Sequence, residues 1–331
     1  MLQQLRFFLV LLCAAVALNS QSSAALPVGS SIIGGKGLIF VAEIRSAQPG
    51  PRSVSPSGLR NRATNVHVRI LRVLKPANGM PYADKEFDAE ITQSTGYGAH
   101  MVSPWWGLNI EAGQRYLILG RSDIVDLRTA LTLALRPMPI TDTEDPSADA
   151  ELILAAEPLS LQSQALALAS GVIGSRLSRS YLFADYAAAL LRAGSDPDTA
   201  ELSQAIEQSP VTAFSETAKT VLLTGLRPDP HSIPHPSHNL MHTYVVMTAR
   251  WLAIESHPQD ELSEDPRSDI LDLHIPTILD SEQTKAVLRG ALPPAVNREF
   301  QKEVLDIIAG GNLNPDQITR LRSFASQVAA Q

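Results

Sequence analysis

The spacing of apolar residues changes along the chain, and this change limits the folds that the chain can adopt. From residue 30 to about 137, apolar residues recur at every second position in short runs; from 151 onward they recur at every third or fourth. A period of two buries one face of a strand, and a period near 3.6 buries one face of a helix. We therefore predict an α+β protein of two domains: a small antiparallel β-barrel over residues 30–137 and an all-α bundle or helix-pair stack over 151–331. A polar, proline-rich linker over 138–150 would join them.

The first half contains five runs with the pattern of strands. Val66, Val68 and Ile70 show the clearest alternation, because polar residues separate them. The predicted strands cover residues 37–45, 65–74, 87–91, 115–119 and 131–135. We expect residues 47–62, which are rich in Pro, Ser and Arg, to form a long connection between the first two strands.

The second half contains short amphipathic segments separated by Gly, Pro and Asp. They predict helices over residues 150–156, 161–169, 180–193, 199–208, 215–226 and 239–255. A last helix should begin at Asn314, because Pro315 follows in the first turn and Gln317 occupies the capping-box position. Each helix has one apolar face, so the helices must pack against one another.

Part of the first half resembles a known family. The segments LIFVAEIRS, NVHVRILRVLKPANG, FDAEITQ and IEAGQRYLILG follow one another in this order. They resemble the strands of netrin-like modules, the OB-type barrels found in tissue inhibitors of metalloproteases, over about 90 of the 331 residues. The resemblance implies a barrel and a binding role. Those inhibitors chelate the protease zinc through an amino-terminal cysteine and are cross-linked by disulfides, neither of which this chain offers, so no inhibitory residue can be carried across.

The amino terminus has the three parts of a secretory signal peptide. Arg6 supplies a positive charge, residues 7–18 are an unbroken apolar run, and small and polar residues follow as far as Ala25. We predict a signal peptide over residues 1–25, cleaved after Ala24 or Ala25, and a periplasmic or extracellular address. An amino-terminal membrane anchor is the alternative, but twelve apolar residues span roughly 18 Å as a helix, against the ~30 Å of a bilayer core.

Export would leave a mature chain without a thiol, because Cys13 is the single cysteine. A lipoprotein anchored at Cys13 is a third reading, although Leu12 lacks the small side chain expected just ahead of a lipidated cysteine. Cleavage would remove disulfides, thiolate nucleophiles and Cys-ligated metal sites together. We expect no membrane span after signal removal. The net charge is −7 and the basic residues are dispersed, so we expect no nucleic-acid partner.

Four histidines within twelve residues form the most unusual segment: His231, His235, His238 and His242. Imidazoles bind zinc, copper and nickel, and the last two histidines have the i,i+4 spacing that chelates from one helix face. Prolines exclude a helix through the first half of the segment. A zinc protease would have Glu where this chain has Asn239. The segment is therefore either a metal site, with zinc as a possible ligand, or an exposed loop whose histidines cap the next helix.

Trp105 and Trp106 are the candidate binding residues. They lie between two predicted strands, and adjacent side chains of an extended segment point to opposite faces. One indole should then be exposed, where large aromatic side chains anchor partners. The alternative is that both fold back and fill the end of the barrel.

The chain lacks the motifs that would assign a reaction. It has no Gly-x-Ser-x-Gly sequence and no phosphate-binding loop, so we assign no catalytic residue. We predict an exported, non-enzymatic protein of the bacterial envelope or exterior that binds a protein or envelope component and needs no cofactor. The alternatives are a metal-dependent hydrolase that uses the four histidines and a purely structural envelope protein.

Overall fold

The fold is described from a computed structural model of the chain. The structure describes residues 33, 37–54, 60–76, 86–95, 103–105, 107–120, 126–173, 180–228, 236–254, 270–280, 282, 302, 304–306, 308–310 and 313–329. The predicted signal peptide over residues 1–25 lies outside the described residues. None of the described helices is long and apolar enough to cross a membrane.

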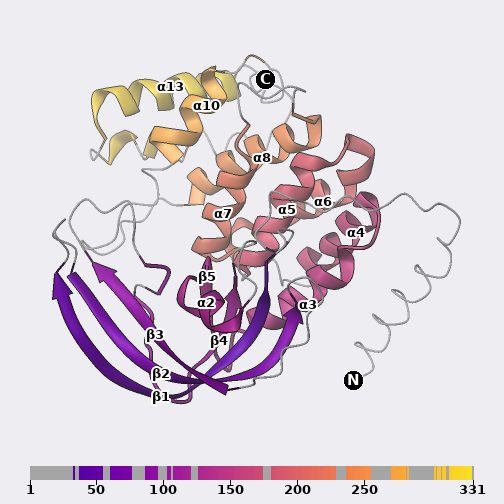
Figure 1. Ribbon diagram of the computed structural model, residues 1–331. Helices are drawn as coiled ribbons and strands as arrows, with labels where there is room; N and C mark the ends of the chain where they lie inside the picture. The colour runs from indigo at the N-terminus through magenta and orange to yellow at the C-terminus, as the bar shows by residue number, and fades with distance from the viewer. Residues whose placement is uncertain are drawn as a thin grey trace, which may run out of the picture.

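Five antiparallel strands form one curved sheet (Figure 1). They are β1 (Ile39–Val54), β2 (Arg60–Lys75), β3 (Glu86–Thr95), β4 (Arg115–Leu119) and β5 (Arg136–Ile140), in the order β3-β2-β1-β4-β5. This confirms the first four predicted strands and the α+β class. The described strands leave β3 and β5 as edges, so the sheet is not closed.

The fifth predicted strand, over residues 131–135, is wrong. Helix α2 (Leu127–Thr132) ends in this region, and β5 follows it. Asp126 caps α2 by accepting a hydrogen bond from the Thr129 N–H at 2.8 Å. The buried residues Leu127, Ala130, Leu131 and Ala134 have helical spacing, whereas Leu133 and Leu135 are exposed. Over so short a length, Leu at alternate positions fits both the strand period of two and the helical period of 3.6. Burial of one side of the segment against the sheet favours the helix.

Each face of the sheet packs against a different layer. Val66, Val68 and Ile70 are buried on the same face as Trp105 and α2, as their alternation predicts. The opposite face contributes Ile39 and Leu117 to the core formed by the helices. The sheet therefore lies between the small helix α2 and the large helical layer.

The helical layer contains the predicted helices. Its members are α3 (Pro146–Ala156), α4 (Leu161–Ile173), α5 (Tyr181–Ala193), α6 (Asp196–Gln208), η3 (Val211–Ala213), α7 (Glu216–Leu226), α8 (His238–Ile254), the π-helical turn η4 (Ile270–His274), α10 (Ile275–Asp280) and α13 (Pro315–Ala329). The capping box of α13 is confirmed. The Gln317 N–H donates to Asn314 Oδ1 at 2.8 Å, and the Asn314 N–H donates to Gln317 Oε1 at 3.1 Å.

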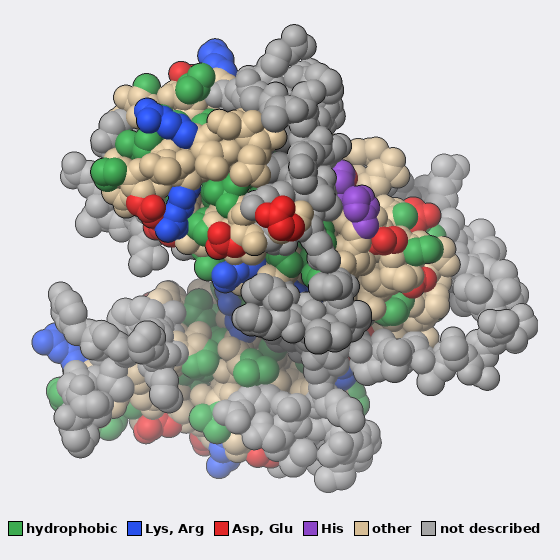
Figure 2. All heavy atoms as spheres, turned by 90° about the horizontal axis from the view of Figure 1, so that it is seen from above, with side chains coloured by type: hydrophobic (Ala, Val, Ile, Leu, Met, Phe, Trp, Pro, Cys, Tyr) green, Lys and Arg blue, Asp and Glu red, His purple; other side chains and the backbone are tan. Residues whose placement is uncertain are grey.

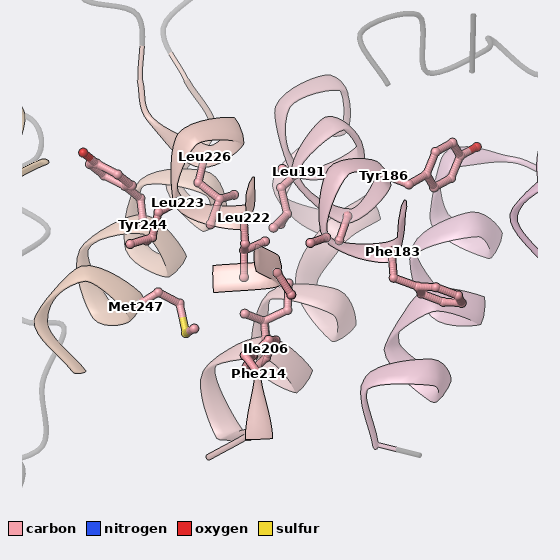
Figure 3. Packing of buried hydrophobic residues seen from close by; sticks show 14 of the residues in the cluster. Phe183, Tyr186, Leu191, Ile206, Phe214, Leu222, Leu223, Leu226, Tyr244 and Met247 are labelled. Atoms are coloured by element: carbon pink, nitrogen blue, oxygen red, sulfur yellow. The ribbon is translucent and has the colours of Figure 1, made fainter. Parts of the chain in front are cut away.

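Helices α5 to α8 direct apolar side chains into one core (Figure 3). Phe183 and Leu191 come from α5, Leu222 from α7 and Tyr244 from α8, and all four are buried. The same core includes residues of β1, β4 and β5. The sheet and the helices are thus joined by continuous packing.

Polar contacts add to this junction. Arg72 of β2 pairs with Glu151 of α3 at 2.5 Å, and Lys75 pairs with Glu157 at 3.1 Å. The predicted linker over 138–150 is largely ordered as the end of β5 and the start of α3, which leaves residues 141–145 as the connection. The division into two domains stays a prediction.

Candidate functional site

Trp105 is part of the core and is not an exposed anchor. Its side chain is fully buried and its indole Nε1–H donates to the Leu131 carbonyl at 3.0 Å. Its ring lies edge-on to that of Tyr116, with centroids 5.1 Å apart. Trp105 is therefore not the exposed indole of the pair, as the alternative of a folded-back side chain predicts, and the binding role of the pair stays a prediction. Trp106 lies outside the described residues.

The loop around Trp105 folds back because β3 supplies hydrogen bonds to it. The Gln93 amide donates to the carbonyls of Trp105 and Leu108 at 2.8 and 2.9 Å, and the Ser103 hydroxyl donates to the Thr92 carbonyl at 2.7 Å. The segment is therefore not an extended strand, and the argument from alternating side chains does not apply to it. Trp105 fills the space beneath the curved sheet.

Helix α8 carries the two described histidines of the predicted cluster. His238 and His242 begin this helix, and their ring centroids are 5.7 Å apart. His231 and His235 lie outside the described residues. Among the residues that the structure describes, no group of three or more His, Cys, Asp or Glu side chains could hold a metal ion. The structure therefore brings together one half of the predicted cluster.

Asn239 has a structural role at the start of α8. Its N–H donates to Asp196 Oδ1 at 2.9 Å, and its side-chain amide donates to the Asp196 carbonyl at 2.7 Å and to Thr199 Oγ1 at 3.1 Å. These bonds join the first turns of α6 and α8. Asn239 directly follows His238, where a zinc protease would have its catalytic Glu. In this chain the residue joins two helices instead.

Glu207, at the end of α6, organises a polar cluster beneath the histidines. One of its carboxylate oxygens accepts hydrogen bonds from His242 Nδ1 at 2.9 Å, the Thr243 hydroxyl at 2.8 Å and the Ser203 hydroxyl at 3.0 Å. Burial acts to raise the pKa of Glu207, but the bonds from His242 and Thr243 outweigh it and lower that pKa below its ordinary value. The bond to Glu207 raises the pKa of His242 against the opposing effect of burial.

A buried histidine that no sequence pattern indicates lies elsewhere in the helical layer. His274 ends the π-helical turn η4, and its Nδ1 lies 2.9 Å from the Tyr244 hydroxyl. Burial, with a smaller contribution from the Arg227 charge, lowers the pKa of His274 to about 4. The imidazole is therefore neutral near pH 7.

The distal part of the β1–β2 hairpin carries exposed arginines. Arg52 lies directly opposite Arg62 in the strand register, and Arg60 lies opposite Val54. All four side chains are exposed, Val54 to 69 %. We call residues 52–54 and 60–62 the arm tip. They border a hollow of about 430 Å³.

The arm tip is ordered as strands where a long connection was expected. The prediction over 47–62 failed because Pro49 and Pro51 argue against a strand. Beyond Glu43, however, β1 pairs only with β2, since β4 ends its pairing there. Proline is tolerated on such an edge, and the register shifts between Pro49 and Arg52.

A larger hollow of about 840 Å³ lies between β5 and the first turns of α3, α5 and α7. Two of its charged groups have roles in the fold. Asp145 caps α3 by accepting from the Ser147 N–H at 3.0 Å, and the Arg136 guanidinium lies 3.9 Å from the centroid of the Tyr181 ring.

Comparison with known proteins returned no match to a family model, to a curated protein or to a solved structure. The netrin-like resemblance therefore stays a prediction.

Proposed function

We propose that the protein is an exported, non-enzymatic binding protein and that its arm tip docks an acidic surface of a protein partner. The observation that supports this most is the direct pairing of Arg52 with Arg62 across the hairpin. Like charges directly opposite one another destabilise a sheet. Neither guanidinium has a carboxylate partner within the part of the chain that the structure describes. An acidic partner would relieve this repulsion on binding.

The chemistry of the arm tip favours carboxylates on a protein. Arginine binds carboxylates through two parallel hydrogen bonds and is enriched in protein interfaces. Val54 adds an exposed apolar side chain between the charges. Three arginines fall short of the roughly 6–10 phosphate contacts of a strong nucleic-acid binder, and the chain as a whole carries a net charge of −7. An acidic protein surface therefore fits better than a nucleic acid.

The position of the arm tip suits docking. β1 and β2 are each 16 residues long, and their distal ends lie away from helices α5 to α8 (Figure 1). The space-filling view shows Lys or Arg side chains exposed at the outer edge of the molecule (Figure 2). A partner could therefore contact the tip without displacing any described helix.

We also infer that the sheet is an incomplete OB-type barrel of the netrin-like kind. Five antiparallel strands curve around Trp105 and α2, and closure would require only that the edges β3 and β5 pair. OB-type barrels are five-stranded and partly open. This likeness supports a binding role but assigns no residue to it.

The experiment that tests the function measures binding of a labelled acidic peptide, with glutamates around a central leucine, by fluorescence anisotropy. Wild-type protein should bind at low salt, and the double substitution Arg52→Glu and Arg62→Glu should abolish binding because it reverses both charges. The matched control is Arg128→Glu with Arg322→Glu, which changes the net charge equally at two exposed arginines elsewhere. Equal losses in both variants, or no binding by the wild type, would refute the proposal.

The rival function, a metal-dependent hydrolase, stays a prediction. Catalytic zinc sites use three protein ligands and an open position. His238 and His242 supply two imidazoles among the described residues, and Glu207 is already engaged by His242. This arrangement favours reversible metal binding over hydrolysis.

A further inference from the structure

We propose that His238 and His242 bind a divalent transition-metal ion of the class that prefers imidazole, namely zinc, nickel or copper, and that Glu207 positions His242 for this role. Histidines at i and i+4 on one helix face can bind one ion together. The two rings lie on the first turns of α8 with centroids 5.7 Å apart. This site is separate from the arm tip and does not depend on its function.

Glu207 fixes the orientation of the second imidazole. His242 Nδ1 lies 2.9 Å from the carboxylate, which also accepts bonds from Thr243 and Ser203. With Nδ1 donating to the carboxylate, the lone pair of His242 lies on Nε2. Metal-binding histidines in proteins have this arrangement, in which a carboxylate holds the nitrogen that does not bind the metal. The ring of His242 is thus already held in the orientation that metal binding requires.

His238 provides the second ligand from a more accessible position. It is exposed, whereas His242 is half-buried. No hydrogen bond to His238 occurs among the residues that the structure describes. Figure 2 shows histidine side chains exposed together on the helical layer, next to acidic side chains. Its ring can therefore turn toward the ion without breaking a described hydrogen bond.

The local charge also favours a cation. The amino terminus of a helix carries a partial positive charge that would oppose a metal ion. Here the Asp196 carboxylate accepts the Asn239 N–H at 2.9 Å and offsets that charge. Glu207 adds a second carboxylate beneath His242. Two acids therefore flank the two imidazoles.

Two imidazoles with water in the remaining positions predict reversible binding of a single ion. Affinity should follow the order of divalent metals, with copper bound more tightly than nickel or zinc. The test is titration of the untagged full-length protein with Zn²⁺ by calorimetry. One equivalent should bind, and His238→Ala or His242→Ala should each weaken the affinity at least tenfold. Glu207→Gln, which keeps an acceptor oxygen but removes the charge, should weaken it by about 10- to 100-fold.

His67→Ala is the matched control, because His67 is also exposed but lies on β2 against Asp88. It should leave the zinc affinity unchanged. Copper provides a second readout that does not depend on stability: electron paramagnetic resonance should show coupling to two nitrogens in the wild type and one in His238→Ala. The proposal is overturned if zinc does not bind, if the His238→Ala and His67→Ala variants bind equally well, or if copper couples to the same nitrogens in both.

Discussion

Acid should destabilise the protein through His274, a group that the proposed function does not use. This imidazole is 2 % exposed, and its pKa in the folded protein is about 4, against 6.5 in an unfolded chain. Because the folded value is the lower one, protons bind the unfolded state more tightly. The stabilising contribution of the neutral ring is therefore complete above pH 6.5 and is lost as the pH falls toward 4.

The size of this loss follows from the two pKa values. The difference between the two pKa values gives a loss of about 2 kcal/mol at pH 5 and about 3 kcal/mol at pH 4. Urea unfolding followed by circular dichroism, measured at neutral pH and near pH 5, gives the free energy of unfolding at each pH. Replacing His274 with Leu should remove about 2 kcal/mol of the difference between the two measurements.

Tyr244→Phe is the control for this experiment. It removes the hydroxyl that lies 2.9 Å from His274 Nδ1 but leaves the imidazole buried. Since burial is the main cause of the low pKa, this variant should keep the pH dependence of the wild type while losing about 1 kcal/mol at every pH. If His274→Leu retains the full wild-type pH dependence, the assignment to this imidazole is refuted.

Two further predictions concern packing. Trp105→Ala should lower the free energy of unfolding by about 3–5 kcal/mol, because it empties a fully buried site and removes the donor to the Leu131 carbonyl. A change below about 1 kcal/mol in urea unfolding would show that the indole is not in the core. Gly225→Ala should lower the free energy of unfolding by about 1–3 kcal/mol, because the added methyl group would lie 2.5 Å from the Ala188 Cβ where α7 crosses α5. In thermal unfolding, adding Ala188→Gly should restore part of the lost stability, and no gain in stability would contradict this contact.

Features that depend on nearby residues could be predicted from the sequence. The alternation of Val66, Val68 and Ile70 identified the buried face of β2 because one face of that strand is covered along its length. The capping box of Asn314 and Gln317 is formed within four residues, so its pattern is visible in the sequence. Local signals of this kind gave four strands and most helices.

Features that depend on distant partners could not be predicted. Residues 131–135 fit both periods, and contact with the sheet decided between them. Pro49 and Pro51 argued against a strand, but the sequence does not show that β4 stops pairing early and leaves β1 at an edge there. Glu207 and His242 are 35 residues apart in the chain, and only the packing of α6 against α8 brings them together. The histidine spacing signalled half of that cluster, and nothing in the sequence signalled its carboxylate.

Cross-linking in the cells that make the protein tests the binding function most directly. A photoreactive amino acid in place of Val54, which lies on the same face of β1 as Arg52 and opposite Arg60, would report what contacts the arm tip. We predict one discrete adduct with a protein, joined at an acidic segment and lost when Arg52 and Arg62 are both changed to Glu. The absence of any adduct, or an adduct that persists unchanged in that double variant, would contradict the account.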